Sequence, residues 1–240
     1  EMQKIRGNEI SMIFQEPMTS LNPILQCGKQ IAESLMLHWG MKKKEAMEEA
    51  IHMMQAVGIA DSEVRAREYP HQMSGGMRQR VMIAMALACQ PRILIADEPT
   101  TALDVTIQAQ ILDLIRKMNE KTGTSVIFIT HDLGVVSELC DTVIVMYTGH
   151  IVEQAPAEEL FGEPKHPYTQ RLLDAVPKIT RERDPLKTIE GMVPNPTERI
   201  EGCSFSPRCP YASDRCRKEA PPMKQISDTR QVRCWRYENT

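Results

Sequence analysis

The chain has 240 residues, of which 42% are hydrophobic, and a formal net charge of −3 at pH 7. This length allows one large domain, or one domain with an appendage, around a sizeable core, and the composition excludes wholesale disorder. The mixed, slightly acidic charge gives no indication of nucleic-acid binding, and the longest apolar run, residues 81–89, is far shorter than the roughly 20 residues of a membrane span.

The first third of the chain is expected to be mostly helical. A short strand is expected at residues 9–14, followed by a loop whose two prolines prevent the strand from continuing. Helical periodicity then covers residues 27–36 and again 42–57. We therefore expect a small helical subdomain over residues 20–73.

From residue 74 onward, strands and helices alternate. The expected elements are a helix at 77–89, a strand at 93–96, an amphipathic helix carrying Ile107 to Met118, a strand at 125–130, a short helix after His131, a strand at 142–147 that turns at Gly149 into 151–152, and a helix at 167–176. Continuous Val and Ile runs between helices indicate an α/β fold with a parallel sheet covered on both faces. Because the composition changes near Pro156, we expect a core of residues 1–19 and 74–155 and an extension of residues 156–240.

A serine and two glycines begin the helix that follows residue 73. Ser74, Gly75 and Gly76 would expose several backbone N–H groups at the positive end of the helix dipole. Phosphate groups bind readily at such a helix start. The segment therefore predicts contact with a nucleoside triphosphate.

Four polar residues at expected strand ends suggest how a γ-phosphate is hydrolysed. Asp97 ends a buried strand and would hold Mg²⁺, while the adjacent Glu98 would polarise the attacking water. His131 ends the neighbouring strand and would reach the same phosphate. Gln15 ends another strand and would ligate Mg²⁺ or water.

The motifs together resemble those of an ATP-binding cassette (ABC) ATPase. Residues 69–80 resemble its signature, residues 94–104 its Walker B motif and D-loop, and residues 129–132 its switch histidine. Residues 14–23 look like the Q-loop of the dipeptide and oligopeptide importer subgroup, and the tail resembles that subgroup's C-terminal extension.

The resemblance implies a P-loop NTPase-like cassette with a helical subdomain. It adds Gln79 and Asp104 to the residues expected to contact ATP. It also implies a head-to-tail dimer in which the signature caps the ATP of a second ABC ATPase subunit. The further partners are transmembrane permease subunits that insert a helix near residues 15–37 and, indirectly, a peptide-binding protein. The protein would lie at the cytoplasmic face of the cell membrane and energise the uptake of di- and oligopeptides.

One part of the cassette is missing from the sequence. The single Gly-Lys pair, Gly28-Lys29, would need glycine at Pro23 and Ser or Thr at Gln30 to form a P-loop. Because the chain also opens on Glu1, we expect that an N-terminal stretch with the P-loop is absent. These 240 residues alone are expected to bind ATP weakly and to be inactive.

The seven cysteines are unevenly distributed. Three lie in apolar or helical contexts and are expected in the core: Cys27, Cys89 and Cys140. The other four crowd the tail: Cys203, Cys209, Cys216 and Cys234. Four thiolates can hold Zn²⁺ or an iron–sulfur cluster, and their wide spacing favours the cluster. The importer subgroup is similar in carrying a 4Fe-4S cluster here. Zn²⁺, and free or disulfide-bonded thiols, are the alternatives.

Two other functions are possible for the same motifs. An ABC ATPase of ribosome recycling or DNA repair would have two cassettes per chain or a long coiled-coil insertion between Gln15 and Ser74, and the segment between them is short. A non-catalytic cassette would be favoured if these residues were the entire native polypeptide.

Overall fold

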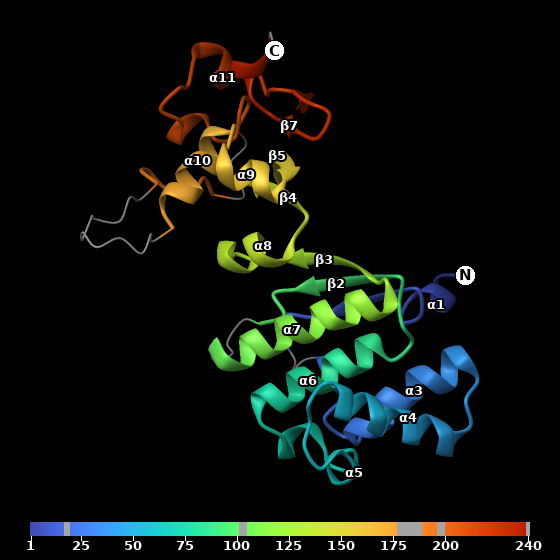
Figure 1. Ribbon diagram of the computed structural model, residues 1–240. Coiled ribbons are helices and arrows are strands. Elements are labelled where there is room, and N and C mark those ends of the chain that lie inside the picture. The colour runs from blue at the N-terminus through green and yellow to red at the C-terminus, as the bar shows by residue number, and fades with distance from the viewer. Residues whose placement is uncertain (17–19, 101–104, 177–188, 196–199, 239–240) are drawn as a thin grey trace. The chain divides into compact units, whose positions relative to one another are not determined.

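The computed structural model describes residues 1–16, 20–100, 105–176, 189–195 and 200–238 (Figure 1). Two compact units divide the chain, Glu1–His131 and Asp132–Thr240. No helix among the described residues has both the length and the apolar character to cross a membrane.

A parallel sheet forms the centre of the first unit. Its strands are β1 (Ile10–Ile13), β2 (Ile93–Asp97) and β3 (Ser125–Ile129), in that order. In the register, Ile13 lies opposite Ala96, and Asp97 lies opposite Ile129. The carboxyl ends of all three strands therefore meet at one edge of the sheet.

The other regular elements described in the first unit are helices. They are α1 (Met2–Ile5), α3 (Cys27–Trp39), α4 (Lys43–Ala56), α5 (Ser62–Arg65), the 3-10 helix η1 (Pro70–Gln72), α6 (Gly75–Leu87) and α7 (Val105–Thr122). Between residues 20 and 73 the described elements are all helical, as expected. Buried side chains of α3, α4, α6 and α7 form one core with the sheet. Figure 1 shows α3, α4 and α5 gathered below α6 and α7.

The second unit is built around an antiparallel sheet. Its elements are α8 (Leu133–Leu139), β4 (Thr142–Tyr147), β5 (His150–Pro156), α9 (Ala157–Gly162), α10 (Pro167–Asp174), η2 (Ser206–Arg208), α11 (Asp214–Lys218), β6 (Lys224–Gln225), β7 (Gln231–Val232) and η3 (Trp235–Tyr237). The strand order is β4-β5-β7-β6.

This second sheet corrects one expectation, that residues 142–152 continue a parallel sheet. Strands β4 and β5 form a hairpin because Thr148 and Gly149 both have positive φ, 45° and 79°. Two such residues form the tight turn whose twist suits antiparallel strands. Since β5 also pairs with β7 from the tail, the compact unit begins at Asp132 and not near Pro156.

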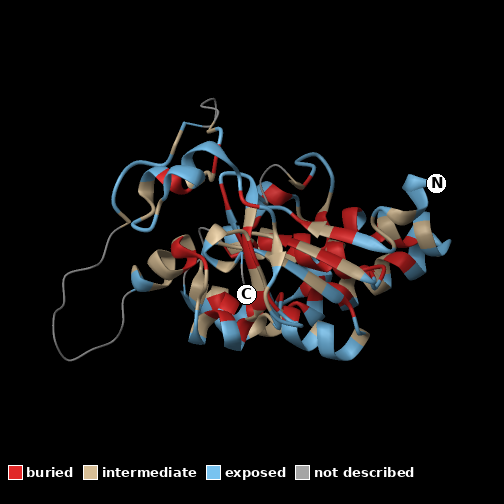
Figure 2. Cartoon of the chain, turned by 90° about the horizontal axis from the view of Figure 1, so that it is seen from above, coloured by how far each residue is buried: buried red, intermediate tan, exposed pale blue. Residues whose placement is uncertain are grey.

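Buried apolar residues alternate with exposed ones along β4, where Val143, Val145 and Tyr147 face the core. Figure 2 shows the buried positions in red along strands and helices. Phe205 from the tail packs in the same core, with its ring centroid 5.3 Å from that of Tyr147 and 5.5 Å from that of Tyr168. Aromatic packing therefore holds the tail against the hairpin.

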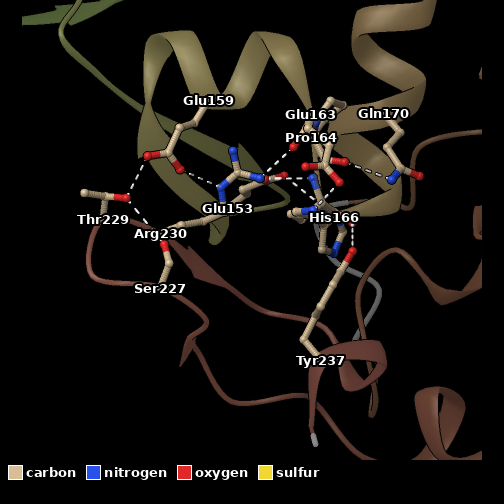
Figure 3. Close-up of polar contacts among 11 residues, drawn as sticks. Glu153, Glu159, Glu163, Pro164, His166, Gln170, Ser227, Thr229, Arg230 and Tyr237 are labelled. Carbon is tan, nitrogen blue, oxygen red and sulfur yellow. Dashed lines mark hydrogen bonds and ion pairs between the residues drawn. The ribbon is translucent and has the colours of Figure 1, made fainter. Parts of the chain in front are cut away.

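A buried ion pair also joins the tail to β5 (Figure 3). The carboxylate of Glu153, with no exposed surface, accepts hydrogen bonds of 2.8 Å from the backbone N–H groups of Lys165 and His166. Arg230 is 4% exposed, lies 3.8 Å from this carboxylate and donates to the carbonyl of Glu163. Each buried charge thus has polar partners, as burial requires.

Candidate functional site

Three of the predicted catalytic side chains meet at the carboxyl edge of the parallel sheet. Glu98 follows β2, the central strand, and lies between Gln15 after β1 and His131 after β3. The amide nitrogen of Gln15 donates to Oε2 of Glu98 at 2.8 Å, and Nδ1 of His131 lies 3.1 Å from Oε1. The His131 side chain is 75% exposed, so this group of three residues is open to solvent and accessible to a ligand.

The backbone at Glu98 has an unusual conformation. Its φ is 43°, in the left-handed region, which residues with a Cβ rarely adopt. The backbone N–H of Glu98 donates to the carbonyl of Ile129 at 2.8 Å, and this bond ties the turn to β3. Strained backbone of this kind often occurs at functional sites.

Asp97, the predicted Mg²⁺ ligand, is the last residue of β2. It lies directly before Glu98 at the same sheet edge. Because the amide nitrogen of Gln15 donates to Glu98, its amide oxygen is the atom that could bind a metal ion. Carboxylate and amide oxygens are the donors that Mg²⁺ prefers, and the residues at this edge therefore fit the ion.

The predicted phosphate-binding turn begins α6. Ser74 is the N-cap, and its hydroxyl oxygen accepts a hydrogen bond of 3.3 Å from the backbone N–H of Met77. Around Gly75 nothing lies within 4 Å of the position that a Cβ would occupy. The start of the helix therefore leaves room for a ligand to approach the backbone.

Gln79 and Asp104 were expected to contact ATP by resemblance alone. The side chain of Gln79 is instead inside the first unit, 3% exposed, and its amide donates to the backbone carbonyl of Pro99. Asp104 lies outside the described residues. No sequence pattern indicates the partner of Gln79, because that partner is a backbone atom twenty positions away.

The Gly28-Lys29 pair is part of a helix and not of a phosphate-binding loop. Gly28 lies in α3, where a Cβ would come within 2.7 Å of the Ala66 Cβ. Because residue 28 has no Cβ, α3 can approach Ala66 closely. The backbone N–H of Gly28 donates to the Ala66 carbonyl at 2.9 Å.

The four tail cysteines line one cavity in the second unit. Cys203, Cys209, Cys216 and Cys234 share its wall with Phe205, Trp235 and other residues. Gly202 brings two of them together: a Cβ there would lie 2.2 Å from the carbonyl oxygen of Cys216, and the neighbouring N–H of Cys203 donates to that oxygen at 2.7 Å. Gly202 was not among the predicted site residues, although it directly precedes the predicted ligand Cys203.

Burial raises the pKa of the Cys203, Cys209 and Cys234 thiols, and the charge of neighbouring cysteines raises each of them further. Backbone hydrogen bonds from Phe205, Tyr211 and Arg236, respectively, act in the opposite direction. No three His, Cys, Asp or Glu side chains of the described ranges are arranged to hold a metal ion. The four predicted ligands therefore line one cavity, but the described residues do not form a metal site there.

The scattered cysteines behave as expected for packed residues. Cys27 and Cys89 are buried in the core of the first unit, where burial raises the pKa of each thiol to about 11. Cys140 is half-buried beside the core of the second unit. At neutral pH such thiols are protonated and unreactive.

Two family models match the chain. The ABC transporter model matches residues 1–101, and the model of the oligopeptide/dipeptide transporter C-terminal region matches residues 152–216. The second match begins within β5 and covers the cysteine-containing tail as far as Cys216. Both units thus carry a family match.

Curated relatives are similar over nearly the whole chain. The oligopeptide transport ATP-binding protein AppD of Bacillus subtilis (strain 168) is 57% identical over 98% of this chain and 72% of its own length. The dipeptide transport ATP-binding protein DppD of Escherichia coli (strain K12) is 50% identical over 98% of this chain and 72% of its own length. These names favour the interpretation as a peptide importer over the alternatives of ribosome recycling and DNA repair.

Solved structures support the fold. The dimeric structure of MJ0796, a bacterial ABC transporter cassette, has a TM-score of 0.59 at 31% identity and covers 65% of this chain and 66% of its own. A post-hydrolysis state of the same cassette, bound to ADP and Pi, gives the same values. By these similarities of sequence and fold, the chain belongs to the ABC transporter ATPases, in the oligopeptide/dipeptide transporter family.

Proposed function

We propose that the complete protein hydrolyses ATP to energise the import of di- and oligopeptides, as the ATPase subunit of an ABC importer. The observation that carries the proposal is the position of Glu98, whose carboxylate is held by Gln15 on one side and His131 on the other. The names of the relatives, oligopeptide and dipeptide transport ATP-binding proteins, support peptides as the substrate class.

In this proposal Glu98 orients the water that attacks the γ-phosphate. A carboxylate polarises water best when its own position is fixed, and the two neighbours hold both of its oxygens. His131 is exposed enough to donate to the γ-phosphate, where negative charge accumulates during transfer. Asp97 and the amide oxygen of Gln15 would hold Mg²⁺, which neutralises phosphate charge when bound.

The signature turn would act on a second nucleotide. In a head-to-tail dimer, Ser74, Gly75 and Gly76 would meet the ATP of a second ATPase subunit, to which they offer backbone N–H groups and the start of a thirteen-residue helix. Dimeric solved relatives support such a pairing. Asp104, which lies outside the described residues, stays a predicted part of this contact.

A permease would dock beside the helical subdomain and hold the protein at the cytoplasmic face of the membrane. Ile24 and Leu37 lie within the predicted docking segment, residues 15–37, and are 78% and 73% exposed. Exposed apolar side chains of this size are typical of interaction surfaces. A peptide-binding protein would act with the same permease.

The tail would hold a 4Fe-4S cluster through Cys203, Cys209, Cys216 and Cys234. Three observations support it: the four thiols line one cavity, neighbouring cysteines raise the pKa of Cys203, Cys209 and Cys234, and backbone N–H groups are directed at the sulfurs of these three residues. Neighbouring thiolates repel one another, and a metal cation between them stabilises the charged form. Hydrogen bonds from backbone N–H groups to the sulfurs also tune the reduction potential of a cluster. Zn²⁺ remains the alternative metal.

Uptake by the complete transporter tests the function. The protein, purified with its permease subunits and placed in liposomes, should hydrolyse ATP faster when a peptide-loaded binding protein is added outside. Labelled dipeptide should accumulate inside the liposomes only with ATP. A transporter that hydrolyses ATP without moving peptides would contradict the substrate class, and one that hydrolyses none would favour the non-catalytic cassette.

A further inference from the structure

Gln79 connects two segments that have separate tasks in the proposed mechanism. It lies one turn into α6, the helix that Ser74 and the two glycines begin. Its amide nitrogen donates to the carbonyl of Pro99 in a buried hydrogen bond. A polar side chain that is 97% buried, as a 3% exposure implies, is specified by its partner, because an unpaired amide would be costly there.

The acceptor of this bond adjoins the proposed catalytic carboxylate. Pro99 directly follows Glu98, and a proline restricts the backbone of the residue before it. Glu98 is already confined, with a φ of 43° and its N–H bonded to the Ile129 carbonyl. A displacement of the Pro99 carbonyl must therefore change the orientation of Glu98.

The donor of this bond sits on a helix that is well anchored elsewhere. Arg80, the next residue of α6, donates to the side chain of Gln110 in α7 and to the carbonyl of Val57 at the end of α4. Gly76 approaches α7 as well, since a Cβ there would lie 3.6 Å from Ile107. A ligand that displaces the start of α6 would therefore move the helix as one body together with these contacts, and Gln79 would move with it.

We propose that Gln79 is a positioning residue that couples nucleotide bound at the signature turn to the carboxylate of Glu98. The inference rests on the proposed function, in which the signature turn of this chain meets the nucleotide of the second subunit. The bond from Gln79 to Pro99 then makes hydrolysis at Glu98 depend on the occupancy of the other site. Gln79 itself does not touch nucleotide.

ATPase kinetics of the complete transporter test the coupling. Gln79→Met keeps the length and bulk of the side chain and removes the donor. It should lower kcat about tenfold and bring the Hill coefficient for ATP toward 1, with ATP affinity unchanged within about twofold. Affinity is measured in a Glu98→Gln background, where hydrolysis does not interfere.

A matched control comes from the second unit. The amide of Gln170 also donates to a proline carbonyl, that of Pro164, at 2.9 Å (Figure 3). Gln170→Met removes the same kind of bond and should leave kcat and the Hill coefficient unchanged. The coupling is overturned if Gln79→Met retains the Hill coefficient of the wild type, or if it weakens ATP binding by more than about tenfold, which would mean direct contact with nucleotide.

A nucleotide-free measurement separates this inference from the proposed function. Ser74→Ala removes the N-cap and should loosen the start of α6. In wild type, we expect it to speed hydrogen exchange of the Glu98 amide several-fold, and in Gln79→Met it should add nothing. An equal effect of Ser74→Ala in both backgrounds would overturn the coupling even if the protein hydrolyses no ATP.

Discussion

Nδ1 of His131 lies 3.1 Å from Oε1 of Glu98, although the two residues follow different strands and are 33 positions apart. The parallel register of β2 and β3 creates this contact, because it places Asp97 opposite Ile129. The other carboxylate oxygen accepts a hydrogen bond from Gln15, which follows β1. Glu98 is therefore the centre of the site, and its neighbours act on it from both sides.

Replacing Glu98 with glutamine should separate ATP binding from hydrolysis. Glu98→Gln preserves size and removes the charge that polarises water, so we expect turnover to fall by about 10²-fold or more with ATP affinity nearly unchanged. Steady-state ATPase activity and nucleotide titration of the complete transporter measure the two quantities. Near-normal turnover would remove Glu98 from the mechanism.

The two neighbours of Glu98 should not contribute independently. We expect Gln15→Ala and His131→Ala each to lower kcat by about 10- to 10²-fold, because each removes a group that holds the carboxylate. The double variant should lose less than the product of the two single losses, since both act on one carboxylate. A double-mutant cycle on kcat gives the interaction energy, and strict additivity would argue for separate roles.

The sequence alone predicted these strand ends but not every partner. Short β-branched runs located β2 and β3, and the Ser74 cap located the start of α6, since such signals are local. The sequence pattern predicted the turn at Gly149 but not the antiparallel pairing of β4 with β5. The contact of Gln79 with Pro99 and that of Glu153 with Arg230 depend on packing between distant segments, which periodicity does not encode.

The tail cysteines should bind iron. Protein purified without oxygen should absorb broadly near ~400 nm and contain about four irons per chain. Cys209→Ser should abolish the absorption, whereas Cys140→Ser, a half-buried cysteine outside the cavity, should retain it. One zinc and no iron by elemental analysis would refute the cluster and leave the transport function untouched.

The buried carboxylate of Glu153 should be a large contributor to the stability of the second unit. Glu153→Gln leaves Arg230 without its fully buried counter-charge and turns an NH₂ group toward backbone N–H donors, which should cost about 3 kcal/mol. Glu159 also lies near Arg230, at 3.5 Å, but is 43% exposed, so Glu159→Gln should cost less than about 1 kcal/mol.

Urea unfolding followed by fluorescence of Trp235 can compare these two variants. The other tryptophan, Trp39, belongs to the first unit and is replaced by phenylalanine in all samples. If both variants lose the same free energy of unfolding, the burial of Glu153 does not explain its contribution to stability.

Close approach at Gly28 should make that position intolerant of a methyl group. Gly28→Ala would place a Cβ 2.7 Å from that of Ala66, and we expect a loss of about 2 kcal/mol in stability. Gly162→Ala, at the end of α9 with nothing within 4 Å, is the control and should be neutral. Thermal unfolding of both variants distinguishes a packing effect from a general preference for glycine.

At Glu98 the left-handed backbone lowers the stability of the protein, whereas the side chain at the same position is needed for activity. A side chain with a Cβ costs about 1 to 2 kcal/mol in that conformation, and glycine costs nothing comparable. Glu98→Gly should therefore relax the turn and raise the melting temperature while it removes the carboxylate. Selection for a more stable protein at this position would select against its chemistry, so the strain persists only as long as hydrolysis is needed.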